Sequence, residues 1–179
     1  MKILMESNDV TQGSLELYFD TYNEIVRGKK VSDGEYISTV LRAAMVVGWL
    51  EGEESDIETA TAYEAAQIAY RINDMYLDSL KGEDEDEVEI ALIFDTDSLR
   101  QGDLERWSKK RAELYDARET NTLHHHKGNA VCAAYFANWI KSPKGSMEDV
   151  SNMSPHAVRE LSRDVLKLYS DVTDFDPNF

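Results

Sequence analysis

The stretch LRAAMVVGWL at residues 41–50 recurs as VCAAYFANWI at residues 131–140. In both stretches a Trp beside an aliphatic residue follows the second of two consecutive alanines by five positions. In the first copy Ile37, Val40, Leu41 and Ala44 have the spacing of one helix face. We therefore predict a helix that starts after an N-cap at residue 32 or 33, and an equivalent helix over about residues 129–141. Each ends in a turn next to its Trp.

Further matches lie on both sides of this stretch, in the same order. QGSLE at residues 12–16 matches QGDLE at 101–105, and Asp56-Ile57 matches Asp149-Val150. A later apolar stripe also recurs: Ile68, Ile72, Met75 and Tyr76 correspond to Leu161, Val165, Leu168 and Tyr169. The offset drifts from 89 to 90 to 93 residues, which indicates small insertions in loops. We predict a mainly α fold of two tandem copies of a three-helix unit, residues 1–82 and 88–179, joined by an acidic linker at 83–87.

The ends of the other helices also have local signals. The first helix of each unit is expected to begin near Ser14 and near Asp103. TAYE at residues 61–64 is a capping-box pattern, and Ser154-Pro155 is an N-cap followed by Pro at the first helical position. Residues 2–6 and 88–95 are rich in apolar residues, and they allow one short strand before each unit, with the two strands paired together.

The composition limits the classes of partner. The chain has 35 acidic and 19 basic residues, and its net charge is −16. Duplex nucleic acid and anionic membranes are poor partners for such a chain, whereas a basic protein would be attracted. Cys132 is the single cysteine, so no internal disulfide can form, and we expect it to be a small buried hydrophobe. The chain start has no signal-peptide pattern, and no apolar run approaches the ~20 residues of a membrane span, so we expect a cytoplasmic protein.

Motifs that carry chemistry are weak in this sequence. The histidines at 124–126 could supply metal ligands, but sequence neighbours cannot all face one ion in regular structure, so we favour an exposed polar loop. The acidic run lacks the ligand spacing of an EF-hand loop. Neither a phosphate-binding glycine motif nor a nucleophile motif is present. We expect no enzymatic activity, no cofactor and no metal site.

Aromatic residues give two interpretations. Trp49 and Trp139 could be anchors for a partner peptide, or they could close the core of each unit, and we favour the core because each follows an apolar helical stripe. A duplicated helical unit is more typical of an extended contact surface than of one active site. The candidate partner-binding residues are Tyr18, Phe19, Trp49, Trp107 and Trp139.

The order of the motifs resembles small helical proteins of tailed phages and prophages. The residues that carry this resemblance are Gln12, Leu15 and Glu16, then 41–50, then Ile72 to Tyr76. They are similar to the patterns of tail assembly chaperones, and the second copy follows them more loosely. The resemblance implies a helical, acidic protein that binds tail tube or tape-measure protein in the host cytoplasm. It brings no catalytic residue.

Three hypotheses follow from these observations. The first is a non-enzymatic phage assembly protein, most simply a tail assembly chaperone. The second is an acidic antagonist that mimics nucleic acid and binds a host DNA-binding or defence protein through charge. The third is a metal-dependent enzyme that uses the histidines at 124–126.

Overall fold

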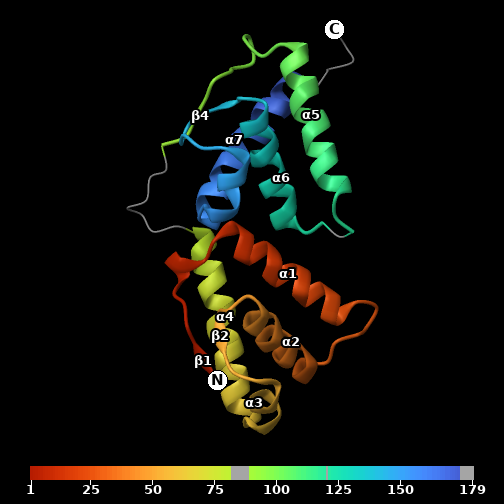
Figure 1. Cartoon of the computed structure of the whole chain (residues 1–179), viewed down its shortest axis with the longest axis vertical. Helices are drawn as coiled ribbons and strands as arrows, with labels where there is room; N and C mark the ends of the chain where they lie inside the picture. The colour runs from red at the N-terminus through yellow and green to blue at the C-terminus, as the bar shows by residue number, and fades with distance from the viewer. Residues whose placement is uncertain (82–88, 120, 174–179) are drawn as a thin grey trace.

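The fold is mainly helical, and its two units are stacked end to end along the long axis of the molecule (Figure 1). The computed structural model describes residues 1–81, 89–119 and 121–173. The predicted linker at 83–87 therefore lies outside the described residues. The first unit contains β1 (Lys2–Ile3), η1 (Ser7–Asp9), α1 (Gln12–Val26), α2 (Asp33–Val46), β2 (Leu50–Glu51), α3 (Glu54–Thr59) and α4 (Ala62–Lys81).

Apart from η1, the described part of the second unit repeats this order of elements. It contains β3 (Ala91–Leu92), α5 (Gln101–Asp116), α6 (Leu123–Phe136), β4 (Ile140–Ser142), η2 (Met147–Asn152) and α7 (Pro155–Thr173). The tandem copies and the short strand before each are thus confirmed. Among the described residues each unit has three longer helices, with a short helical element, α3 or η2, before the last of them. None of the helices that the structure describes combines the length and apolar character needed to cross a bilayer.

Side-chain caps fix the starts of the helices. Ser32 is the N-cap of α2, and its N–H donates to the Glu35 carboxylate at 2.8 Å. The predicted capping box of α4 is confirmed, because the Thr61 hydroxyl and N–H both donate to Glu64. The Asp of each matched pair caps its short helix: Asp56 accepts from the Glu53 N–H, and Asp149 accepts from the Ser146 N–H, both at 2.8 Å.

The turn after α2 and the turn after α6 have the same hydrogen bonds. The Trp49 N–H donates to the Ala44 carbonyl at 2.9 Å, and the Trp139 N–H donates to the Ala134 carbonyl at 2.8 Å. The residue before each Trp is in the left-handed region, with φ 76° at Gly48 and 58° at Asn138. This is a Schellman motif, in which a left-handed residue ends the helix and turns the next side chain back onto it. The motif places both Trp side chains in the core.

Each Trp carbonyl also holds the strand that begins its own unit. The Leu4 N–H donates to the Trp49 carbonyl at 3.0 Å, and the Ile93 N–H donates to the Trp139 carbonyl at 2.7 Å. β1 pairs antiparallel with β2, and β3 pairs antiparallel with β4. The predicted pairing of the two N-terminal strands with each other is therefore wrong. The residues after each Trp form β2 or β4, and each of these strands pairs with the N-terminal strand of its own unit.

Two separate hydrophobic cores have equivalent aromatic stacks. In the first core, Tyr18 is stacked on Trp49 with ring centroids 4.9 Å apart. In the second, Trp107 is stacked on Trp139 at 5.1 Å. A tyrosine from the last helix completes each group: Tyr76 lies 6.0 Å from Tyr18, and Tyr169 lies 4.9 Å from Trp107. Stacked or tilted rings at these distances stabilise the fold beyond the contribution that comes from burying them.

Helix α1 lies across the junction between the two units, next to α6 and η2 (Figure 1). Its first residue, Gln12, donates its backbone N–H to the Met153 carbonyl at 2.8 Å and its side-chain amide to the His124 carbonyl at 3.1 Å. Gly13 is needed because a Cβ there would lie 3.0 Å from the Ser151 carbonyl oxygen. Arg118 bridges to Glu16 at 2.9 Å. Polar contacts therefore hold one unit against the other.

The Schellman turn gives a direct test of the repeat. A Cβ at Gly48 would meet no atom within 4 Å, so a substitution there changes only the backbone energy. We expect Gly48→Val to lower the free energy of unfolding by about 1–2 kcal/mol, because a β-branched residue is strained at positive φ. Gly48→Asn, which places the second unit's residue in the first, should cost clearly less. Urea denaturation measures both, and equal losses would contradict this account of the turn.

Candidate functional site

Most of the predicted partner-binding residues belong to the cores. Trp49 and Trp139 have no exposed surface, and Trp107 and Tyr18 are 1% and 2% exposed. The Trp side chains therefore lie in the cores of the units, and a partner cannot reach these rings without opening a unit. Phe19 is only half-buried, and it is stacked on His124 of the other unit with centroids 4.6 Å apart. Its ring contributes to the junction.

The three histidines do not form an exposed loop, as the sequence had suggested; they lie in the first turn of α6. This helix begins six residues before its predicted start because Thr122 is its N-cap. The Thr122 N–H donates to His125 Nδ1 at 3.0 Å, so the imidazole accepts the hydrogen bond that Glu35 accepts in the first unit. Thr122 and His125 have the same three-residue spacing as Ser32 and Glu35, and this spacing was the signal that sequence analysis missed.

The three imidazole rings have different neighbours. His124 is stacked on Phe19, and the His126 Nε2 lies 2.6 Å from the Tyr115 hydroxyl. His125 is fully buried, and its Nε2 lies 3.3 Å from an Asp20 carboxylate oxygen. Within residues 1–81, 89–119 and 121–173, no group of three or more His, Cys, Asp or Glu side chains is arranged to hold a metal ion. The rings of His124 and His125 therefore contact α1 at the junction, whereas His126 makes its contact within the second unit.

His125 is the centre of a buried polar network between the units. Because its Nδ1 accepts a hydrogen bond, the neutral ring has its proton on Nε2, which faces Asp20 and Glu16. Burial lowers the pKa of His125, and the positive charge of Arg118 lowers it further, against the opposing effect of the two carboxylates. A neutral imidazole therefore separates the acidic face of α1 from the core of the second unit.

The thiol of Cys132 has no activated environment. Burial raises its pKa to about 12, and its Sγ donates weakly to the Met147 carbonyl at 3.7 Å. The thiolate is the nucleophilic form, so this cysteine is unreactive at neutral pH. Its half-buried position agrees broadly with the small apolar role expected from the sequence.

A line of exposed apolar side chains runs along α4. Tyr63, Tyr70 and Leu77 are 71%, 61% and 44% exposed, and they are spaced by seven residues, so they lie on one side of the helix. We call these three residues the α4 stripe. The equivalent positions of α7 are polar: His156, Arg163 and Ser170. The stripe is therefore a feature of the first unit, and the second unit has no equivalent of it on α7.

The surface beside the α4 stripe is acidic. A groove of about 290 Å³ lies between α4 and the N-terminal segment, and Glu6, Asp74 and Asp78 line it together with one cation, Arg71. Asp78 already pairs with Lys81 at 2.8 Å. Glu6 and Asp74 are thus the carboxylates that a bound cation would meet first. Apolar side chains from β1 and α4, among them Ile3 and Met75, form the floor of this groove.

Comparisons with known proteins give no relative. No family model matches the chain, and no curated protein or solved structure is similar to it. The function therefore has to be inferred from the surface itself. Sequence analysis missed the α4 stripe because the apolar positions 68, 72, 75 and 76 of the same helix gave the stronger pattern. The seven-residue spacing of Tyr63, Tyr70 and Leu77 would have indicated it.

The stacked histidine at the junction predicts a change of stability with pH. Burial is the main cause that lowers the pKa of His124 to about 4, and nearby Lys127 adds to it. In the unfolded chain His124 becomes protonated below pH 6.5. In the folded chain it stays neutral until the pH falls to about 4. The free energy of unfolding should consequently fall as the pH is lowered through this window.

The variant His124→Phe keeps a ring against Phe19 and removes the titrating group. Its stability should depend less steeply on pH than that of the parent protein between pH 6.5 and pH 4. Urea denaturation at several pH values measures this difference, in which the contributions of the carboxylates cancel. Parallel pH profiles for the two proteins would show that His124 does not titrate abnormally.

Proposed function

We propose that this chain is a non-enzymatic interaction protein that binds an amphipathic, basic helix of a partner along the α4 stripe. The observation that carries the proposal is the seven-residue spacing of Tyr63, Tyr70 and Leu77 on an exposed helix face. Side chains at this spacing form the seam of a two-helix contact. The stripe is about 21 Å long, which matches about four turns of a partner helix.

The residue types in the stripe suit this role. Tyrosine is enriched among residues that dominate binding energy, because its ring buries a large area and its hydroxyl can be hydrated at the rim. Exposed apolar side chains arranged in a line, in contrast to scattered ones, are typical of interaction sites. The Tyr63 hydroxyl accepts a hydrogen bond from Gln67 at 2.7 Å, which orients one ring along the helix.

The charge of the surface specifies the partner. Glu6 and Asp74 lie beside the stripe, with Arg71 as the cation of the same groove, and the whole chain has a net charge of −16. A partner helix with Lys or Arg beside its apolar seam would be attracted and oriented by these carboxylates. The tail assembly chaperone suggested by the sequence fits this description, with a tail tube or tape-measure protein as the partner. The acidic surface would keep such a complex soluble.

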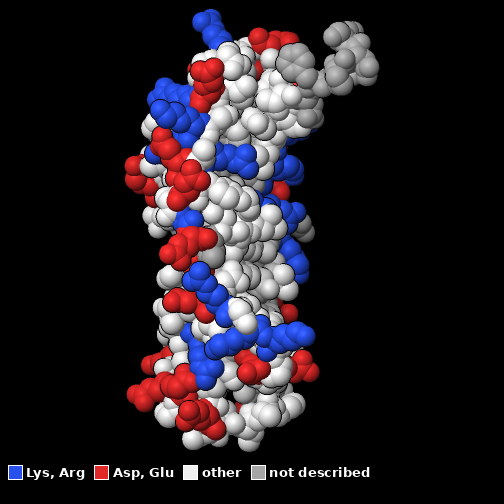
Figure 2. Space-filling view, turned by 90° about the vertical axis from the view of Figure 1, so that its right-hand side faces the viewer, with Lys and Arg blue, Asp and Glu red and all other residues white. Residues whose placement is uncertain are grey.

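The alternative of a nucleic-acid mimic has less support. A mimic needs a continuous acidic strip, but on the face shown in Figure 2 Lys and Arg are interspersed with Asp and Glu. Several carboxylates are also engaged in capping helices, among them Glu35, Asp56 and Asp149. Mixed charge of this kind does not imitate the regular spacing of phosphates.

The second unit provides substitutions for a test. In the variant Tyr63→His, Tyr70→Arg, Leu77→Ser, each residue is replaced by the one that α7 has at the equivalent position, so the fold should tolerate it. A fluorescent peptide of three heptads, with Leu in the seam and Lys beside it, is the probe. We expect the parent protein to bind it and the variant to bind it roughly ten-fold or more weakly.

Two controls make the result specific. Val46→Ser with Leu123→Ser removes apolar side chains that are 62% and 64% exposed elsewhere, and this variant should bind as the parent does. A peptide with Glu in place of Lys should bind poorly to every variant. Equal binding of the parent and the stripe variant would refute the proposal.

Co-expression with the proteins encoded beside this gene then identifies the partner, and recovery of a basic DNA-binding protein would favour the antagonist.

A further inference from the structure

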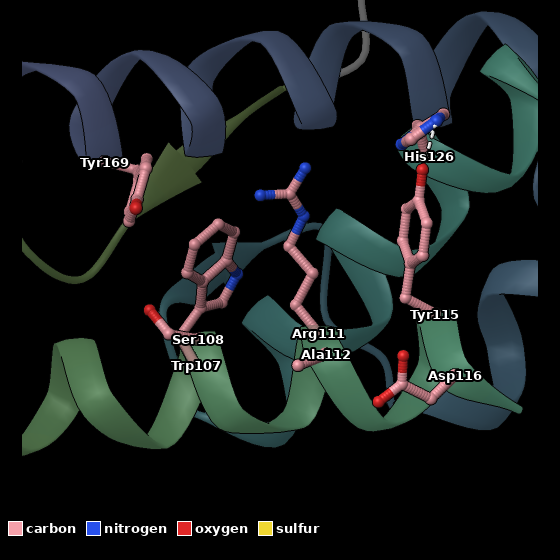
Figure 3. A pocket seen from close by; sticks show the side chains of 8 residues that line it. All are labelled: Trp107, Ser108, Arg111, Ala112, Tyr115, Asp116, His126 and Tyr169. Carbon is pink, nitrogen blue, oxygen red and sulfur yellow. Dashed lines mark hydrogen bonds between the residues drawn. The ribbon is translucent and has the colours of Figure 1, made fainter.

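A second candidate site lies in the other unit, on helices that the α4 stripe does not involve. A cavity of about 470 Å³ opens between α5, α6 and α7. This volume is in the range of pockets that bind small molecules. Its walls are formed mainly by Trp107, Ser108, Arg111, Tyr115, His126 and Tyr169 (Figure 3).

The duplication explains why the cavity is found here. The first unit has three aromatic rings, Phe19, Tyr22 and Tyr36, at the positions equivalent to Ser108, Arg111 and His126. These rings fill their surroundings: Phe19 lies 5.5 Å from Tyr76, and Tyr22 lies 6.2 Å from Tyr36. Replacing them by a hydroxyl, a guanidinium and an imidazole removes ring volume and introduces donors. The core beneath keeps an equivalent stack, Tyr18 on Trp49 in the first unit and Trp107 on Trp139 in the second.

Arg111 gives the cavity its charge. Its side chain extends from α5 into the space between Trp107 and Tyr115 (Figure 3). Its Nε is buried and has no hydrogen-bond partner among the described residues, and no carboxylate of these residues forms an ion pair with it. The guanidinium carbon lies 5.3 Å from the Trp107 ring. A buried N–H without an acceptor is costly, and a planar carboxylate matches the forked donors of a guanidinium.

The other walls limit the shape of the ligand. Tyr169 is half-buried, and its ring forms an aromatic wall that a ligand can reach. The Trp107 ring, 4.9 Å away, is only 1% exposed and belongs to the core. On the opposite side, the His126 Nε2 is 2.6 Å from the Tyr115 hydroxyl, which fixes both rings. Asp116 lies at the exposed edge of the cavity and would repel a second negative charge. The ligand should therefore be flat, apolar for most of its length and singly charged.

We propose that this cavity binds a small aromatic carboxylate, with its ring against Tyr169 and its carboxylate on Arg111. In this arrangement Arg111 provides the paired donors, and Ser108 provides the space that Phe19 fills in the first unit. The proposal does not depend on the function proposed for the α4 stripe.

The first test uses the unmodified full-length protein and two probes of the same shape. We expect 2-naphthoate to bind with a dissociation constant below about 1 mM in isothermal titration calorimetry. The neutral amide, 2-naphthamide, should bind roughly ten-fold or more weakly, because a charge-assisted pair with arginine is lost. Equal affinity for the two probes, or no heat of binding for 2-naphthoate, would overturn the proposal.

Variants then locate the site. Arg111→Gln should remove the preference for the carboxylate over the amide, whereas Arg106→Gln, which removes the same charge from the same helix, should keep it. Arg106 lies over the Phe136 ring at 5.2 Å, and it does not line the cavity. Ser108→Phe introduces the equivalent residue of the first unit and should abolish binding of both probes. An equal loss of preference in the Arg106 and Arg111 variants would mean that only the net charge matters.

Discussion

The Schellman turn before Trp49, and its copy before Trp139, is the constraint on which both units depend. The turn ends a helix, places a large ring in the core and presents a carbonyl to the N-terminal strand within three residues of chain. Each of these steps needs the left-handed residue in front of the Trp. If the helix continued, the ring would lie on a different side, and the strand would lose its hydrogen-bond acceptor. This explains why both the apolar spacing and the Trp recur in the sequence.

The two units are similar in their interiors and different on their surfaces. In both cores the stacked rings come from equivalent positions in the repeat, and the distances between their centroids are similar. The outer faces differ. The first unit has the exposed α4 stripe, and the second has a cavity that holds Arg111 where the first unit has Tyr22. The two units therefore present surfaces of different chemistry on a common scaffold. The junction is the third specialised surface, where α1 of one unit meets the histidines of the other.

The sequence was sufficient for the features that depend on local chemistry. Capping residues such as Ser32 and Thr61, the Ser-Pro start of α7 and the paired Trp residues have short-range signals, so the mainly helical repeat was predicted correctly. The early start of α6 was missed because His125 acts as a capping acceptor, which histidine seldom does. The strand pairing was wrong because it depends on where the chain goes after the Trp. The cavity and the junction network were not predictable at all, since Arg111, His126 and Tyr169 come together only through the packing of three helices.

The central claim is that this protein acts through the face of α4, and the location of binding tests it most directly. Amide chemical shifts, recorded by nuclear magnetic resonance while the Lys-flanked helical peptide is added, give that location residue by residue. The account predicts that the largest changes fall on the exposed side of α4 and on the adjoining residues 3–7, with little change on the equivalent side of α7. Changes spread over α5 to α7, or centred on the junction, would contradict it.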